Sequence, residues 1–402
     1  MMSIPTLRNP RLFSGLSTAW FIVLYPGYLA YHFSVGSGVI PPVLGGFFTP
    51  CSLVFMLMMS VPFISMVRCS DRTLPVLAPL GLFLGIVAVS AVVGAMFGIP
   101  EILNDSMIGA SSRLLLLYVS SFILGATVTL GPRLGYGALL CSMIVIAVIV
   151  SMNIAENGFQ FVYMTGAKGA NAAASYQEMA RSFLYPAILL VAYSKFLPLK
   201  LAITVTALFV LFLIGARSEF VGMLLVLMIL GAISRASAKL GILIACGAGV
   251  ALVVAQGDLI SDNRILTLFD LTSDTSTHSR QAMKELGMQA IASDPLFGEY
   301  GGHVHWGEGL GTYIHDLFST WRQYGFVAFA AYVWLMIYGM YVAIRSVARR
   351  RTMASEACLY VMSSSVLLAL FAKSVFWFMP AFGWGMVYRL LVESDPRVSE
   401  DD

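Results

Sequence analysis

Apolar runs long enough to cross a membrane recur along the whole chain, separated by short polar connections. A helix needs about 20 such residues to span roughly 30 Å of hydrocarbon. Backbone groups inside hydrocarbon must bond within their own segment, so these runs predict helices and exclude open sheets. The alternating polarity over about ten residues that is typical of a membrane β-barrel does not occur.

The pattern predicts an all-α, polytopic membrane bundle of about twelve transmembrane helices. The expected spans are 13–33, 44–67, 74–98, 114–131, 134–152, 183–197, 199–215, 218–234, 239–255, 324–344, 356–375 and 376–392. Lys373, Trp377 and Pro380 interrupt the last apolar region. That region therefore fits either two spans or one span with a re-entrant segment.

Composition agrees with lipid as the main solvent of the chain. Charged residues make up 11% of the 402 residues and hydrophobic residues 58%, which leaves too little polar surface for a water-soluble globule. The net charge of +3 is too small to argue for nucleic acid as a partner. We therefore expect membrane lipids as partners and no nucleic acid.

Basic residues gather in alternate connections, and the positive-inside rule assigns those connections to the cytoplasm. They hold Arg8, Arg11, Arg68, Arg72, Arg133, Lys195, Lys200, Arg235, Lys239, Arg345, Arg349 to Arg351 and Arg397. Both termini are then expected in the cytoplasm. The connections expected outside are 34–43, 99–113, 153–182, a tight turn at 217–219, and 257–323.

The chain is expected to form a single membrane domain, 1–402, in which the loop 257–323 faces outward. This loop holds four of the five histidines, and its tryptophans and phenylalanines argue against disorder. Residues 279–293 predict an amphipathic helix with Met283, Leu286, Ala290 and Ile291 on one stripe. Asp294-Pro295 ends that helix, and the glycines that follow predict irregular backbone able to approach a ligand closely.

His315 is the first candidate catalytic residue. It lies just ahead of the helix expected to enter the membrane near Gly325, so a rigid element would hold it at the interface. An imidazole there can accept a proton from a hydroxyl nucleophile near neutral pH. The alternative is a structural histidine that caps the helix or bonds Asp316.

Arg217 is the second candidate, in a turn between two spans at the outer membrane boundary. Its guanidinium fork matches the oxygens of a phosphate group in a bidentate geometry, which predicts capture of an anionic group. Snorkelling or a local carboxylate partner is the alternative. Arg280 and Arg322 are further candidates of the same kind, each with an ordinary interfacial role as its alternative.

His303 and His305, with Glu299 and Glu308 nearby, are the only histidine pair at alternate positions in the loop. No third ligand follows at a recognised metal-site spacing, so the pair does not by itself predict a metal centre.

The order of these features resembles the O-antigen polymerase and ligase superfamily, membrane glycosyltransferases of the GT-C type. The resemblance covers about residues 200–345. Its motifs are Gly215 to Ser218, Ser279-Arg280, Asp294-Pro295-Leu296-Phe297-Gly298, His315-Asp316-Leu317-Phe318 and Tyr324-Gly325-Phe326. The sequence departs from the family pattern at Asp316, where Asn is usual, at Ala216 in the turn, and at Ala328, where a second glycine is usual.

This resemblance implies a bacterial inner-membrane enzyme with a periplasmic active site, and favours the polymerase branch over the ligase branch. The donor would be a glycan on undecaprenyl diphosphate. Arg217, Arg280 and Arg322 would bind the diphosphate, while His315 would activate a sugar hydroxyl for attack with inversion. No metal or nucleotide cofactor is implied, and the acceptor would be a glycan or the lipid A core. A chain-length regulator protein is a further partner that the resemblance suggests.

Three alternatives remain open at this point. A ligase would move the finished glycan to lipid A core. A flippase or other transporter would carry charged residues near the bilayer midplane, whereas charge here collects at the outer edge. In a membrane scaffold without catalysis, Arg217 and His315 would be incidental.

Overall fold

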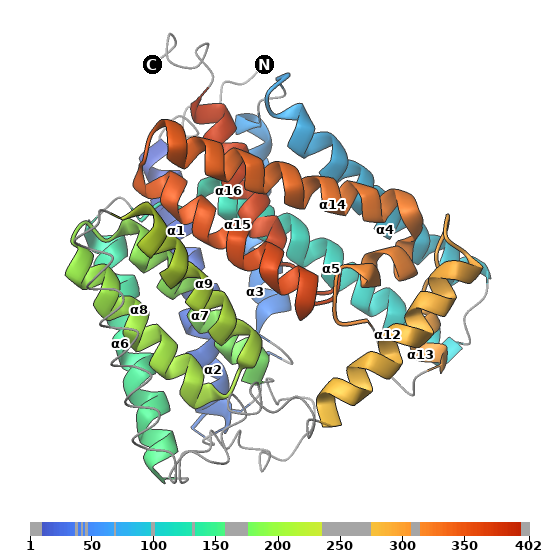
Figure 1. Ribbon diagram of the computed structural model, residues 1–402, viewed down its shortest axis with the longest axis horizontal. Helices are drawn as coiled ribbons and strands as arrows, with labels where there is room; N and C mark the ends of the chain where they lie inside the picture. The colour runs from blue at the N-terminus through green and yellow to red at the C-terminus, as the bar shows by residue number, and fades with distance from the viewer. Residues whose placement is uncertain are drawn as a thin grey trace. The chain divides into compact units, whose positions relative to one another are not determined.

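The structure is a computed structural model that describes residues 10–36, 39–41, 43–44, 47–67, 70–97, 101–130, 133–156, 176–234, 275–306 and 314–394. All regular secondary structure in these ranges is helical (Figure 1). The predicted all-α class is therefore confirmed for the described part of the chain.

Six helices among the described residues are long and apolar enough to cross a membrane. They are α4 (Leu74–Phe97), α5 (Glu101–Thr127), α6 (Arg133–Glu156), α8 (Leu197–Ile214), α14 (Phe318–Arg349) and α15 (Met353–Phe371). These helices indicate a multi-pass membrane protein. The total of about twelve spans stays a prediction, and the expected span 239–255 lies outside the described residues.

Several expected boundaries differ from the structure. The expected connection 153–182, for example, ends earlier, because a helix begins at Tyr176. The first expected span, 13–33, is two helices, α1 (Pro10–Leu24) and α2 (Pro26–Gly36), because proline at position 26 disfavours helical geometry in the residue before it. The expected connection 99–113 is wrong, since α5 begins at Glu101. Polar residues there extend the helix beyond the apolar run, and an acidic first residue favours a helix N-terminus.

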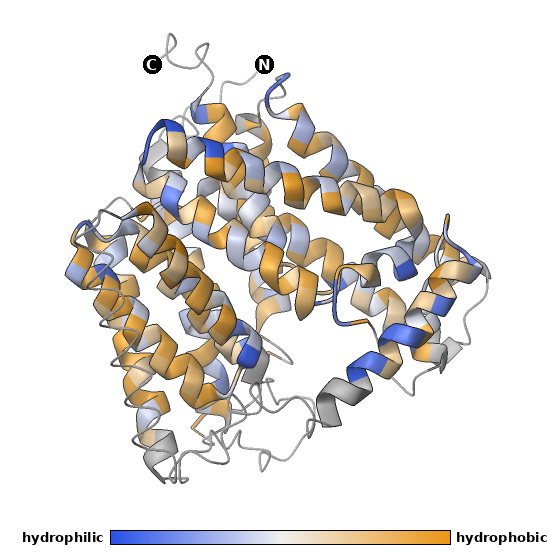
Figure 2. Ribbon diagram, viewed as in Figure 1, coloured by the Kyte–Doolittle hydropathy of each residue, from blue (hydrophilic) through white to orange (hydrophobic). Residues whose placement is uncertain are grey.

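The chain divides into two compact units, each built from segments distant in sequence. The first contains α1, α2, α6, α7 (Tyr176–Tyr193), α8, α9 (Arg217–Ile233) and the beginning of α15. Within it α7 packs on α8 and α9 and is buried along most of its length. The hydrophobic residues that α6, α8 and α9 carry over most of their lengths are visible in Figure 2.

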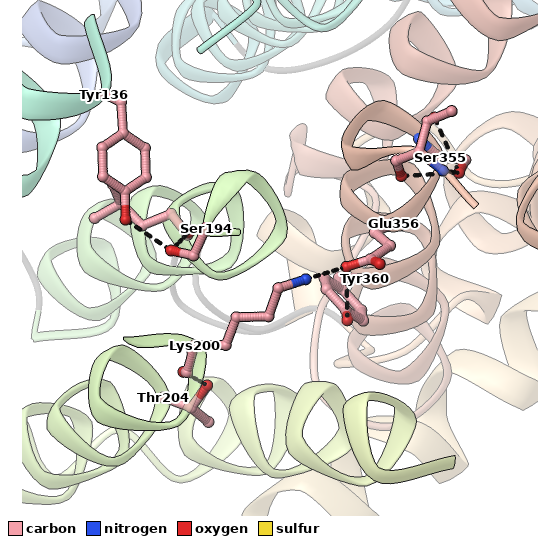
Figure 3. A network of polar contacts seen from close by, with 9 residues as sticks. Tyr136, Ser194, Lys200, Thr204, Ser355, Glu356 and Tyr360 are labelled. Atoms are coloured by element: carbon pink, nitrogen blue, oxygen red, sulfur yellow. Dashed lines mark hydrogen bonds and ion pairs between the residues drawn. The ribbon is translucent and has the colours of Figure 1, made fainter. Parts of the chain in front are cut away.

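A buried ion pair ties α8 to α15 inside the first unit. Lys200 pairs with Glu356, which also accepts a hydrogen bond from Tyr360 at 3.5 Å (Figure 3). Lys200 and Glu356 are both nearly inaccessible to solvent. A charge buried in this way needs its partner, because an isolated ion in a low-dielectric interior costs several kcal/mol.

The second unit contains most of α3 (Phe48–Met66), α4, α5, α12 (Thr275–Ser293), α13 (Gly302–Trp306), α14, the end of α15 and α16 (Met379–Glu393). Helix α14 lies along α4 and also contacts α16 (Figure 1). A Cβ atom on Gly385 would lie 2.1 Å from the carbonyl oxygen of Phe122. Helices α5 and α16 thus touch backbone to backbone, as small residues allow in membrane bundles.

The apolar region 356–392 contains two helices, α15 and α16, separated by residues 372–378. The hydroxyl of Tyr118 donates to the carbonyl oxygens of Val375, at 2.8 Å, and Trp377, at 3.3 Å. This connection is therefore fixed against α5.

Candidate functional site

The candidate site lies in the second unit, where α12 crosses the N-terminal part of α14. A Cβ atom on Gly287 would lie 2.3 Å from the side chain of Ile314, so α12 approaches this segment as closely as glycine allows. Gly287 and Ile291 form the buried side of α12. The predicted helix is confirmed, although it begins at Thr275 and Leu286, expected on the buried stripe, is 55% exposed.

A break in α14 receives the segment that follows α12. Gly325 has φ 77° and ψ 179°, which interrupts the helix one turn after Trp321. The amide of Phe326 donates to the carbonyl oxygens of Pro295 at 3.1 Å and Leu296 at 3.2 Å. The indole of Trp321 donates to Pro295 at 2.8 Å.

Gly298 faces Gly325 across this junction and also has a positive φ, of 74°. A Cβ atom on Gly325 would lie 2.1 Å from the oxygen of Leu296, and one on Gly298 would lie 2.6 Å from the nitrogen of Gly325. Both glycines are therefore required for residues 295–299 to pack into the break. The irregular backbone predicted after Asp294-Pro295 is confirmed here.

His315 is half-buried directly before α14. Burial and, to a smaller extent, the nearby cations Arg280 and Lys373 together lower the pKa of its imidazole to about 4. The ring is therefore neutral at pH 7. A neutral imidazole can accept a proton, and the two cations beside it can attract an anionic group.

Asp316 supports the start of α14. Its carboxylate accepts a hydrogen bond from the amide of Phe318 at 2.9 Å and forms an ion pair with Lys284 of α12 at 3.1 Å. Asp316 is also buried. The residue that bonds the helix start is thus Asp316, and its charge is matched by Lys284.

Lys373 is a residue of this site that the sequence pattern did not reveal, since it was interpreted only as an interruption between two spans. It lies in the connection between α15 and α16 and is 8% exposed. The amide of Val375, two residues later, donates to the hydroxyl of Ser319 at 2.7 Å. This bond fixes the connection against the residues that follow His315.

Arg322 lies beneath α12 and is 3% exposed. Its guanidinium is 3.7 Å from the carboxylate of Glu299, and its backbone oxygen accepts the amide of Glu299. Arg322 therefore joins α14 to the segment after α12 in this structure. Its expected contact with a diphosphate stays a prediction.

His303 is buried beside the same network. The amide group of Gln323 donates to His303 Nδ1, and Gln323 accepts the amide of Gly301 at 3.1 Å. Burial and the nearby cation Arg322 lower the pKa of His303 to about 4, against the opposing effect of its hydrogen bond with Gln323. The described residues contain no group of three metal-ligating side chains, and the side chain of His305 lies outside them.

Arg217 belongs to the first unit, where it is the first residue of α9 and half-buried. The turn expected at 217–219 lies instead at Gly215 and Ala216, since Gly215 ends α8 with φ 73° and Arg217 to Glu219 are helical. Only glycine takes that left-handed geometry at little cost. Ser218 donates to the carboxylate of Glu219 at 2.6 Å, and Glu219 is buried.

The described structure therefore brings together His315, Arg280 and Lys373, and next to α14 also Arg322, Glu299 and His303. Comparison with known proteins adds no relative to this description: no family model and no curated protein matches the chain.

Proposed function

We propose that this protein is a membrane glycosyltransferase that joins lipid-linked oligosaccharide repeats into a polysaccharide at the periplasmic face of a bacterial inner membrane. The observation that carries the proposal is a neutral imidazole, His315, held beside the cations Arg280 and Lys373. General-base and anion-binding groups are the two functions that transfer from a diphosphate donor needs.

In the proposed step, a hydroxyl oxygen of the acceptor sugar attacks the anomeric carbon of the donor glycan. The bond between that carbon and the diphosphate oxygen breaks with inversion, and undecaprenyl diphosphate leaves with its electron pair. His315 takes the hydroxyl proton and later releases it to water. Arg280 and Lys373 stabilise the negative charge that develops on the diphosphate, and the resemblance alone assigns Arg217 to diphosphate binding.

The low pKa of His315 fits a base that is activated by its substrate. With Arg280 and Lys373 nearby, the free imidazole is a weak proton acceptor. A bound diphosphate would offset both cations and raise the imidazole pKa toward its ordinary value. His315 would then become a stronger base only when the donor is present.

The test is complementation of a strain that lacks the protein, with surface polysaccharide and lipid-linked glycans resolved on a gel. We expect His315→Ala and Arg217→Ala to abolish long chains while the protein remains inserted and abundant. Arg217→Lys should also be poor, since a point charge does not replace a guanidinium fork. Glu285→Gln, at an exposed position of α12, is the matched control and should retain normal polymer.

Normal long chains from His315→Ala and Arg217→Ala would reject the proposed chemistry. The glycans of the deletion strain also separate polymerase from ligase, which is the second candidate. Lipid-linked single repeats indicate lost polymerisation, whereas lipid-linked long chains indicate lost ligation. Accumulation of repeats on the cytoplasmic side would instead indicate a transporter.

A further inference from the structure

Two neighbouring apolar side chains are strongly exposed directly after α12. Leu296 is 63% exposed and Phe297 is 79% exposed, in the segment that fills the break at Gly325. Helix α12 itself exposes the charged residues Arg280, Lys284 and Glu285 together with Leu286 and Met288. Hydrophilic stretches along α12 are visible in Figure 2. An exposed leucine and phenylalanine side by side need a partner of their own.

The position of this pair is fixed by the backbone of α14. Phe326 donates to Pro295 and Leu296, so the exposed turn is held where the continuous part of α14 begins. Phe326 and Val327, the next residues of α14, are also exposed. The turn is thus continuous with the exposed surface of the helix.

That surface of α14 is one apolar face. Its members recur at spacings of three, four or seven residues, that is one or two helical turns, which places them on one side of a helix. They are Val327, Trp334, Ile337, Tyr341 and Ile344. Because α14 is long and apolar enough to span a membrane, this face is where acyl chains would contact it.

We propose that Leu296 and Phe297 insert into the outer boundary of the bilayer beside α14, with lipid as their partner. Trp321, which bonds Pro295, stacks on Phe329 with ring centroids 4.8 Å apart. Tryptophan at such a level is typical of the membrane interface. The inserted pair would hold α12 at the membrane surface, whatever reaction the protein performs.

The test measures the depth of a nitroxide in the full-length protein. The natural cysteines are replaced, Phe297→Cys is labelled, and the protein is placed in nanodiscs of phosphatidylethanolamine and phosphatidylglycerol. Power saturation with oxygen and with a water-soluble nickel complex reports whether the label lies in lipid. Gln289→Cys, exposed on α12, is the matched control.

We expect the label at 297 to be more accessible to oxygen than to nickel, and the label at 289 to show the reverse. Equal nickel access at both positions would overturn the proposal. Dipolar broadening confined to position 297 would also overturn it, because it would show a second copy of the chain as the partner.

If the cysteine-free protein fails to insert, a second variant measures the same contact with lipid. Phe297→Trp in the natural background should add fluorescence that lipids brominated near the headgroup quench. No added quenching relative to the unmodified protein would contradict insertion.

Discussion

At the scale of single residues, the environment of His315 depends on a lysine that lies 58 positions away in the sequence. Lys373 contributes charge to the site because Val375 is hydrogen-bonded to Ser319. Hydropathy assigns such a lysine to a break between spans and gives no information on its partner. His315 and Arg280 could be chosen as candidates from the loop sequence, whereas Lys373 came into view only from the packing of the connection between α15 and α16.

The protonation of His315 gives a prediction that does not depend on activity. Diethyl pyrocarbonate modifies neutral imidazole, and an ordinary histidine with a pKa near 6.5 loses roughly 25-fold of its neutral form between pH 7 and pH 5. His315, with a pKa of about 4, should lose little reactivity over that range. Peptide mass spectrometry measures the rate at this residue.

Lys373→Met should steepen that profile, because removing the cation raises the pKa of His315. Free N-acetylhistidine provides the reference at each pH. If His315 of the protein without substitutions follows the reference curve, its imidazole does not have the buried, positively charged environment described above.

At the scale of elements, the apolar pattern predicts where most helices of the described residues lie, but it predicts their first and last residues less accurately. Helix α4 has nearly its expected bounds, because a strongly apolar run lies between the polar residues Asp71 to Thr73 and a sequence, Gly98-Ile99-Pro100, whose glycine and proline disfavour helix. Helix α5 extends into residues expected to be a connection. The break in α14 could not be predicted, because it depends on the packing of residues 295–299 against Gly325. The hydrophobic periodicity of α14 gives no information on that packing.

The break predicts a large difference between two glycine substitutions. Gly325→Ala should destabilise the protein by about 3 kcal/mol or more, because an L residue at positive φ costs about 1 to 3 kcal/mol and its Cβ would overlap Leu296. The thermal midpoint of the detergent-solubilised protein measures this change. Protease sensitivity between residues 290 and 300 should rise in parallel.

Gly85→Ala in α4 is the matched control, since a Cβ atom there would meet nothing within 4 Å. It should be neutral or stabilise by up to about 1 kcal/mol, because alanine favours the helix. Equal effects of the two substitutions would mean that the break does not require glycine.

At the scale of the whole molecule, the chain has the membrane-protein character expected from its composition, and the described residues contain six helices able to span a membrane. Its division into two units, each built from segments distant in sequence, was not evident from the sequence, because contacts between distant segments leave no mark in local hydropathy. The expected orientation of the chain in the membrane rests on the distribution of Lys and Arg among the connections.

Orientation gives a prediction for Arg217 and His315 together. If the basic connections lie in the cytoplasm, Arg217→Cys and His315→Cys should both react with a membrane-impermeant maleimide added to intact spheroplasts. Arg349→Cys, at the end of α14, should react only after permeabilisation. Labelling of Arg217→Cys and His315→Cys from opposite sides would remove the basis for a shared donor site.

The ion pair between Lys200 and Glu356 carries a consequence for how the protein is made. The two partners are 156 residues apart, so α8 leaves the ribosome long before its counter-ion exists. Until α15 arrives, the early helices hold a cation whose burial is unfavourable. The first unit should therefore complete its assembly late in biosynthesis, and chains that stop before residue 356 should be recognised by quality-control proteases as unfinished.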